Sequence, residues 1–159
     1  MPLVAAPPAP EVRSFEAFYR SAWPDAVRLA ALLTQRRAVA EDLAQEAFAR
    51  MYPKWERATR PDAYLRRTLI NVSINWYRRN ATERGKLPPL VDVASAELGF
   101  DELADAVATL PFRQRAVLVL RYHHGCSEAE IADALGCRPG TVKSLTSRAL
   151  ARLRKEIDT

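Results

Sequence analysis

The sequence has few of the residues on which secreted, membrane-spanning and metal-binding proteins depend. Its 159 residues include two cysteines, two histidines and five glycines. No stretch approaches the roughly 20 apolar residues of a membrane span, and the N-terminus MPLVAAPPAPEV lacks the basic and long apolar regions of a signal peptide. We therefore expect a cytoplasmic protein with no membrane insertion of its own, in which both cysteines stay reduced.

The few residues suited to catalysis or metal binding are badly placed for either. His123 and His124 are adjacent, so their side chains diverge on a helix. Their spacing to Cys126 and Cys137 fits no common zinc pattern. The sequence also lacks a glycine-rich phosphate loop and a convincing nucleophile–base pair. We expect no metal, no cofactor and no enzymatic activity.

Positive charge is present in excess and is unevenly distributed. The net charge is +5 and the pI is near 9.6, which favours a polyanionic partner. Residues 60–86 carry seven cations against two acids, and residues 138–155 carry six cations and no acid. Residues 92–105, between them, hold five acids and no cation. This pattern indicates two contact surfaces on one long anion.

Helix-breaking glycine and proline residues divide the chain into two helical blocks, at about 14–80 and 98–157. The segment 81–97 between them contains Gly85, Pro88 and Pro89, and no strong period-2 alternation occurs anywhere. We predict an all-α fold of two small helical domains, joined by a flexible linker at 81–97. Residues 1–13 are expected to be a disordered tail rich in proline and alanine.

Two helices of the first block carry polar groups beside apolar stripes. In 39–52, an apolar stripe leaves Asp42, Gln45 and Glu46 on another side, and the simplest interpretation is a solvated polar face. The helix 62–79 has two apolar stripes roughly 150° apart at the helical turn angle. Arg67, Asn71 and Arg78 project between these stripes and suit bases or phosphates. The alternative is a core helix with snorkelling arginines.

The second block contains two helices joined by a short turn. A further helix is expected before these two. Its expected N-cap is Thr109, and it should end at Gly125. Ser127 and Glu130 have the spacing of a capping box, and that helix should end at Gly136. A gap of three residues, 137–139, precedes the next helix, which is the spacing of a helix-turn-helix.

The last helix separates apolar and cationic residues. Val142, Ala149 and Leu153 fall on one side, which should pack inward. The opposite arc suits a DNA major groove, because short serines permit close approach while cations flank them. Its members are Lys143, Ser144, Ser147, Arg148 and Arg154. The alternative is an exposed basic helix end, which the helix dipole also favours.

Together the blocks resemble an RNA polymerase sigma factor of the extracytoplasmic-function (ECF) group, with sigma-70 regions 2 and 4 only. DLAQEAFARMY is similar to the region 2 helix that docks on polymerase, and LPFRQRAVLVLRY with SEAEIADALGCRPGTVKSLTSRALARLR is similar to region 4. The resemblance implies region 2 at 14–80, a linker at 81–97 and region 4 at 98–159. It implies a factor that binds core RNA polymerase and directs promoter-specific initiation.

The resemblance also assigns roles to residues. Asp42, Gln45 and Glu46 would bind the β′ clamp helices, and the first region 4 helix would meet the β flap. Loop 54–63 and helix 62–79 would open the −10 element, with Asn71 on a base. Phosphate contacts there are expected from Arg66, Arg67 and Arg78. The −35 element would meet Lys143, Ser144, Ser147 and Arg148, with Arg138 and Thr141 on its backbone. An anti-sigma factor is a further expected partner.

The sequence departs from the family pattern in the second block. Arg138-Pro139 stands where a serine cap is usual, and Leu145 replaces a frequent arginine. A competing hypothesis is a dimeric helix-turn-helix regulator that binds duplex DNA without polymerase. It explains residues 111–155 equally well, but it does not explain the basic, two-sided helix of the first block.

Overall fold

The computed structural model describes residues 14–81 and 107–158, and all regular elements in these ranges are helices. The first unit, 14–81, contains α1 (Phe15–Thr34), α2 (Arg37–Met51), the 3-10 helix η1 (Tyr52–Arg57) and α3 (Pro61–Ala81). The second unit, 107–158, contains α6 (Phe112–Leu118), the π-helix η2 (Val119–His123), α7 (Glu128–Leu135) and α8 (Pro139–Ile157). The predicted all-α fold is confirmed. The expected tail at 1–13 and nearly all of the linker lie outside the described residues.

The first unit is held together by a core of long apolar side chains. Leu33, Phe48, Met51 and Ile70, from α1, α2 and α3, are each at most 2% exposed. Rings of α1 surround Phe48, whose centroid lies 4.7 Å from that of Tyr19. The apolar stripe predicted for residues 39–52 is therefore the side of α2 that faces the core.

The second unit is a compact helix-turn-helix. Ile131 and Val142 are fully buried, and the capping box of Ser127 and Glu130 forms as predicted. α7 ends at Gly136 in the left-handed conformation, with φ +64°. Glycine adopts this conformation without the clash that a Cβ introduces, which explains the stop.

Three predicted boundaries are wrong. Thr109 does not cap the helix before α7, because α6 has Pro111 at its N-cap position. Proline disfavours a helical conformation for the residue before it, and Pro111 itself is non-helical here, with φ −54° and ψ 148°. Part of the expected loop 54–63 is the 3-10 helix η1, and α8 begins one residue earlier than predicted, at Pro139. Proline suits the first position of a helix, as Pro139 does in α8, because the N–H that it lacks would have no partner within the helix there.

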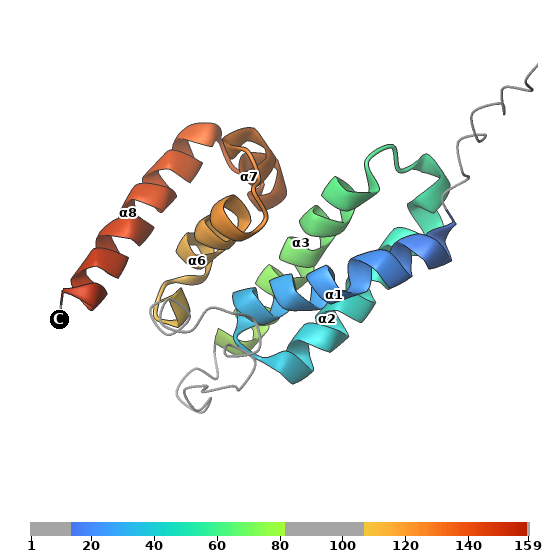
Figure 1. Cartoon of the computed structure of the whole chain (residues 1–159), viewed down its shortest axis with the longest axis horizontal. Helices are drawn as coiled ribbons and strands as arrows, with labels where there is room; N and C mark the ends of the chain where they lie inside the picture. The colour runs from blue at the N-terminus through green and yellow to red at the C-terminus, as the bar shows by residue number, and fades with distance from the viewer. Residues whose placement is uncertain (1–13, 82–106, 159) are drawn as a thin grey trace, which may run out of the picture.

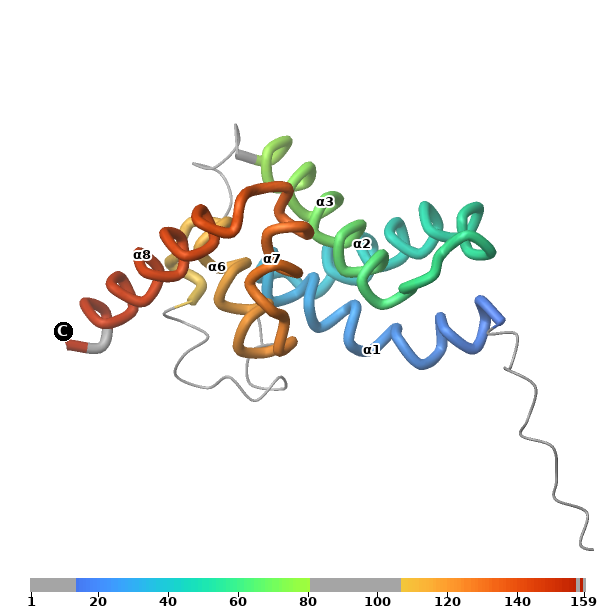
Figure 2. The backbone as a smooth tube through the Cα atoms, turned by 90° about the horizontal axis from the view of Figure 1, so that it is seen from above, coloured from blue at the N-terminus to red at the C-terminus, as the bar shows by residue number. Residues whose placement is uncertain are grey.

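The two units pack against each other along α3. Figure 1 shows α6 and α7 beside α3, with α8 at the far end, and Figure 2 shows the same order from above. The buried apolar cluster is continuous, running from Leu69 in α3 to Val117 and Ile131 in the second unit. The Tyr77 and Phe112 rings meet across this contact at 5.3 Å.

Candidate nucleic-acid interface

The outward side of α8 is polar and open to solvent. We call Arg138, Thr141, Lys143, Ser144, Ser147 and Arg148 the α8 face; all six residues are exposed. On the inner side, Val142 and Ala149 are fully buried and Leu153 is 8% exposed, so the predicted two sides are observed. Arg138, Thr141, Ser144 and Arg148 line a shallow hollow of about 410 Å³. Lys143 and Ser147 lie on the same helix outside that lining.

Few contacts within the chain occupy the α8 face. Lys143 Nζ lies 3.8 Å from Glu128 Oε1, and the Ser144 hydroxyl donates to the Gly140 carbonyl at 3.2 Å. Arg138 stands at the N-cap position without a side-chain cap bond. Leu145, at the position where the family pattern often has an arginine, is 9% exposed and belongs to the buried apolar cluster.

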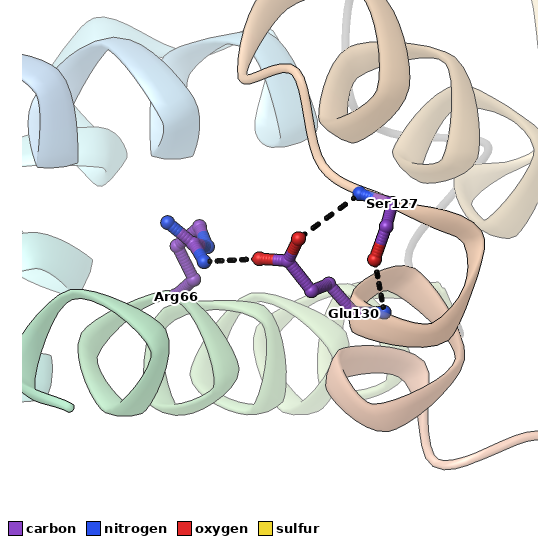
Figure 3. Close-up of polar contacts among 3 residues, drawn as sticks. All are labelled: Arg66, Ser127 and Glu130. Atoms are coloured by element: carbon purple, nitrogen blue, oxygen red, sulfur yellow. Dashed lines mark hydrogen bonds and ion pairs between the residues drawn. The ribbon is translucent and has the colours of Figure 1, made fainter. Parts of the chain in front are cut away.

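Two arginines on the polar side of α3 form ion pairs with the second unit. We call Arg66, Arg67, Asn71 and Arg78 the α3 face. Arg66 Nη2 lies 2.9 Å from Glu130 Oε2 of α7, as Figure 3 shows. Arg67 Nη1 lies 3.8 Å from Asp133 Oδ1 of the same helix. The contact is closest at Arg66, whose side chain is 24% exposed.

The other half of the α3 face lines a large cleft. Asn71 and Arg78 border a cavity of about 1260 Å³ between α3 and α6. The cavity has further arginines around it, which sequence reasoning missed because they come from helices far apart in the chain, at the two ends of α2 and in α6: Arg36, Arg50, Arg113 and Arg115. Arg115 is 5% exposed, and its Nε has no hydrogen-bond partner among the described residues. Burial lowers the pKa of Arg115 to about 10, so the guanidinium keeps its charge at neutral pH.

The polar side of α2 is exposed next to the aromatic cluster. Asp42 and Gln45 are exposed and Glu46 is half-buried. The Tyr19 hydroxyl donates to Gln45 Oε1 at 2.8 Å, and Arg50 Nη2 donates to Glu46 Oε1 at 2.7 Å. These bonds orient two of the three predicted docking side chains, while Asp42 projects from the same surface one turn earlier.

Residues suited to other chemistry are dispersed. In the ranges 14–81 and 107–158, no three histidine, cysteine or acidic side chains form a group that could hold a metal ion. None of the helices described there is long and apolar enough to cross a membrane. Cys126 is buried, and that burial raises the pKa of its thiol.

Comparisons with known proteins agree on one family. Residues 18–83 match the family description "Sigma-70 region 2", and residues 100–153 match "Sigma-70, region 4". The "RNA polymerase sigma-E factor" of Streptomyces coelicolor is 39% identical, over 92% of this chain and 88% of the relative. The "ECF RNA polymerase sigma factor SigC" of Mycobacterium tuberculosis is 31% identical, over 86% of this chain and 80% of the relative.

Solved structures give the same result. The sigma factor RpoE of Bartonella quintana, in complex with the anti-sigma factor NepR, matches with a TM-score of 0.77 and 25% identity. The match covers 91% of this chain and 97% of that one. CnrH in complex with the cytosolic domain of CnrY matches with a TM-score of 0.67 at 23% identity, over 91% of this chain and 87% of that one, which supports the fold.

Proposed function

The chain belongs to the ECF group of the sigma-70 family, and from this premise we propose which of its residues carry out each step of promoter recognition. As a sigma factor, it binds core RNA polymerase and directs promoter-specific transcription initiation. The proposed division assigns residues 14–80 to region 2, 81–97 to the linker and 98–159 to region 4. The factor acts in the cytoplasm and has no catalytic activity of its own.

The α8 face binds the −35 element in this proposal. Lys143, Ser144, Ser147 and Arg148 reach base edges and flanking phosphates in the major groove, while Arg138 and Thr141 hold the backbone. The single observation that carries the proposal is this exposed, acid-free face on the second helix of a helix-turn-helix.

The α3 face, with residues 54–63, binds the non-template strand of the −10 element. Asn71 hydrogen-bonds a base, and Arg66, Arg67 and Arg78 contact phosphates. Extracting a base from the duplex costs a few kcal/mol, which stacking, hydrogen bonds and cations along the strand offset. The strand must therefore reach α3 for the promoter to open.

Asp42, Gln45 and Glu46 form the proposed contact with the β′ clamp helices. All three lie on one helix, and two are already oriented by bonds to Tyr19 and Arg50. The first helix of region 4 meets the β flap, and the linker passes through the polymerase between the two regions. An anti-sigma factor holds the protein inactive, as supported by the neighbouring RpoE structure with NepR.

Run-off transcription with purified core polymerase on a promoter library tests the assignment. Asn71→Ala should impair promoter opening, and Lys143→Ala should weaken closed complexes through the −35 element. The matched control is Arg152→Ala, which removes an exposed cation from α8 outside the α8 face. Unchanged transcripts from Asn71→Ala and Lys143→Ala would contradict the residue roles.

A gel shift without polymerase separates a sigma factor from a helix-turn-helix regulator. The protein should bind promoter duplex weakly alone and strongly with core polymerase. Tight binding of a palindromic duplex by the protein alone would favour the regulator.

A further inference from the structure

The cleft between α3 and α6 is lined by positive charge without negative charge. Its lining comes from α3, α6, the turn between α1 and α2, and the end of α2, and it includes five arginines: Arg36, Arg50, Arg78, Arg113 and Arg115. No aspartate or glutamate is among the described residues that line it. Cations gathered in a concave surface attract anions strongly, because low-dielectric walls focus their field. The cleft therefore favours an anionic occupant.

Contacts within the chain leave most of this charge unpaired. Arg50 Nη2 lies 2.7 Å from Glu46 Oε1. Arg113 donates a hydrogen bond to the Leu135 carbonyl at 3.2 Å, and that acceptor carries no net charge. Within residues 14–81 and 107–158, no ion pair is found for the other arginines of the lining: Arg36, Arg78, Arg113 and Arg115.

Arg115 is the member of the lining that folding alone explains least. It is 5% exposed, its Nε has no hydrogen-bond partner among the described residues, and its guanidinium carbon lies 5.9 Å over the Phe112 ring. A buried charge without an opposite charge destabilises a folded protein. An anion bound in the cleft would supply the opposite charge.

Gln114 precedes Arg115 on α6 and leaves an acceptor unsatisfied. Its Oε1 is buried without a hydrogen-bond partner in the described ranges, and the residue also lines the cleft. Phosphate oxygens accept hydrogen bonds and satisfy arginine, whereas a carbonyl oxygen needs a donor such as a hydroxyl or amino group. The two unsatisfied atoms together fit a ligand that carries both kinds of group. Since both atoms are buried, side-chain rotation accompanies binding.

The rest of the lining suits a ligand larger than a phosphate ion. The cavity of about 1260 Å³ exceeds the roughly 300–1,000 Å³ of most small-molecule sites. The half-buried rings of Trp76 and Tyr77 line it, together with the side chains of Asn75 and Asn80. Aromatic rings stack on nucleobases, and amide groups orient polar ligands by hydrogen bonds. The cleft thus offers partners for a phosphate, a hydroxyl and a base.

We propose that the cleft between α3 and α6 binds a free nucleotide that carries a polyphosphate group. The phosphates meet Arg115 and the neighbouring arginines, Gln114 accepts a hydrogen bond from the sugar or the base, and the base lies against Trp76. This site is additional to the promoter contacts, and the inference does not depend on the roles proposed for the α3 face.

Isothermal titration calorimetry of the full chain with ATP, without polymerase or divalent cations, tests the site. Arg115→Met replaces the buried guanidinium with an apolar side chain, and Arg36→Gln removes a half-buried cation from another part of the lining. The matched control is Arg37→Gln, because Arg37 is the next cation in the chain, is exposed and lies outside the lining. Tripolyphosphate and adenosine, titrated separately, distinguish the contributions of the phosphates and the base.

Wild type and Arg37→Gln should bind ATP with equal affinity. Arg115→Met should weaken ATP binding about tenfold or more, the loss expected for a hydrogen bond between charged groups. Arg36→Gln should weaken it about threefold, because this cation is partly exposed. Tripolyphosphate should bind about tenfold more weakly than ATP, since it lacks a base that can stack. Adenosine, which has no phosphate, should show no binding.

Thermal unfolding without ligand separates binding from folding. Arg115→Met should unfold at the same temperature as wild type or at a higher one, because it removes an unpaired buried charge. If Arg115→Met does not fold, the comparison between Arg36→Gln and Arg37→Gln decides the question.

The proposal is overturned if ATP does not bind wild type. It is also overturned if Arg36→Gln and Arg115→Met bind ATP as tightly as the control, since the basic surface alone would then attract the nucleotide. Binding of a single-stranded DNA octamer that depends on Arg115, without binding of ATP, would overturn it and assign the cleft to a DNA strand. The transcription test is independent, because its variants change Asn71 and Lys143, which are kept here.

Discussion

The two units treat their proposed DNA surfaces in opposite ways. The α8 face is exposed, and within residues 14–81 and 107–158 the ion pair found on it is the 3.8 Å contact between Lys143 and Glu128. The α3 face is paired with α7 or borders the cleft to α6. Arg66 and Arg67 of the α3 face are therefore engaged with acids of α7, although Arg67, Asn71 and Arg78 are themselves exposed.

The units also differ in how their interiors are filled. In the first unit, four aromatic rings of α1 converge on Phe48 of α2, at centroid distances of 4.7–6.2 Å: Phe15, Phe18, Tyr19 and Trp23. The second unit is filled mainly by aliphatic side chains such as Val117, Leu120 and Ile131. Part of its apolar surface is covered by α3. We therefore expect the first unit to supply most of the stability of both.

Replacing Phe48 tests this dependence and should have the largest effect. Phe48 is 2% exposed, so Phe48→Ala should lower the free energy of unfolding by about 3–5 kcal/mol through lost burial and the cavity left behind. Because the core is continuous, signals from both units should shift together in urea unfolding. The control is Tyr52→Ala, since Tyr52 is 64% exposed although its ring lies 4.9 Å from that of Phe15. If Phe48→Ala left the urea midpoint of the second unit's signal unchanged, the second unit would be stable without the first.

The ends of α1 and α7 allow a sharper comparison of the units. Both end on a left-handed residue, Gln35 with φ 62° and Gly136 with φ +64°. An added Cβ at Gly136 would meet no atom within 4 Å, so Gly136→Ala should cost only the conformational penalty of about 1–2 kcal/mol. Gln35→Gly should change stability by less than about 0.5 kcal/mol, because relief of strain offsets the lost 2.8 Å bond from Gln35 Nε2 to the Leu32 carbonyl. Equal effects in urea unfolding would contradict this account.

His124 makes the contact between the units sensitive to pH. It lines a cavity of about 260 Å³ with Asp25, Asp62 and Arg66, and its Nε2 has no hydrogen-bond partner in the part of the chain that the structure describes. Burial, followed by the neighbouring charge of His123, lowers the pKa of His124 to about 4; Asp25 opposes this shift, and Arg66 and Arg28 add to it. The unfolded chain, with a histidine pKa near 6.5, therefore binds the proton more readily than the folded protein.

The contribution of His124 is fully present above pH about 6.5 and is lost as the pH falls toward 4. Between pH 7 and 5 wild type should lose about 1 kcal/mol of stability more than His124→Asn, after allowance for partial exposure. Urea unfolding at the two pH values measures the difference. Parallel losses in wild type and variant would show that His124 does not report on the contact.

Features that depend on spacing within one helix could be predicted from the sequence. The capping box at Ser127, the stop at Gly136 and the two sides of α8 all follow from residue type and helical period. The contact between Arg66 and Glu130 could not, because it joins residues 64 positions apart whose approach depends on the packing of whole helices. Arg115 was also hidden, because the sequence alone does not reveal that the second unit buries this cation in an apolar helix.

The N-caps give the smallest predicted difference between the units. The Ser14 hydroxyl accepts the N–H of Ala17 at 3.1 Å. The Ser127 hydroxyl accepts the N–H of Glu130, and the backbone N–H of Ser127 donates in turn to Glu130 Oε1. Ser127→Ala should therefore cost about 1 kcal/mol and Ser14→Ala about half as much, both measured by urea unfolding. Ser127→Ala keeps the backbone N–H that donates to Glu130 Oε1, so the contact between Glu130 and Arg66 should remain in this variant. Equal costs for the two variants would show that the capping box adds nothing to the cap at Ser127.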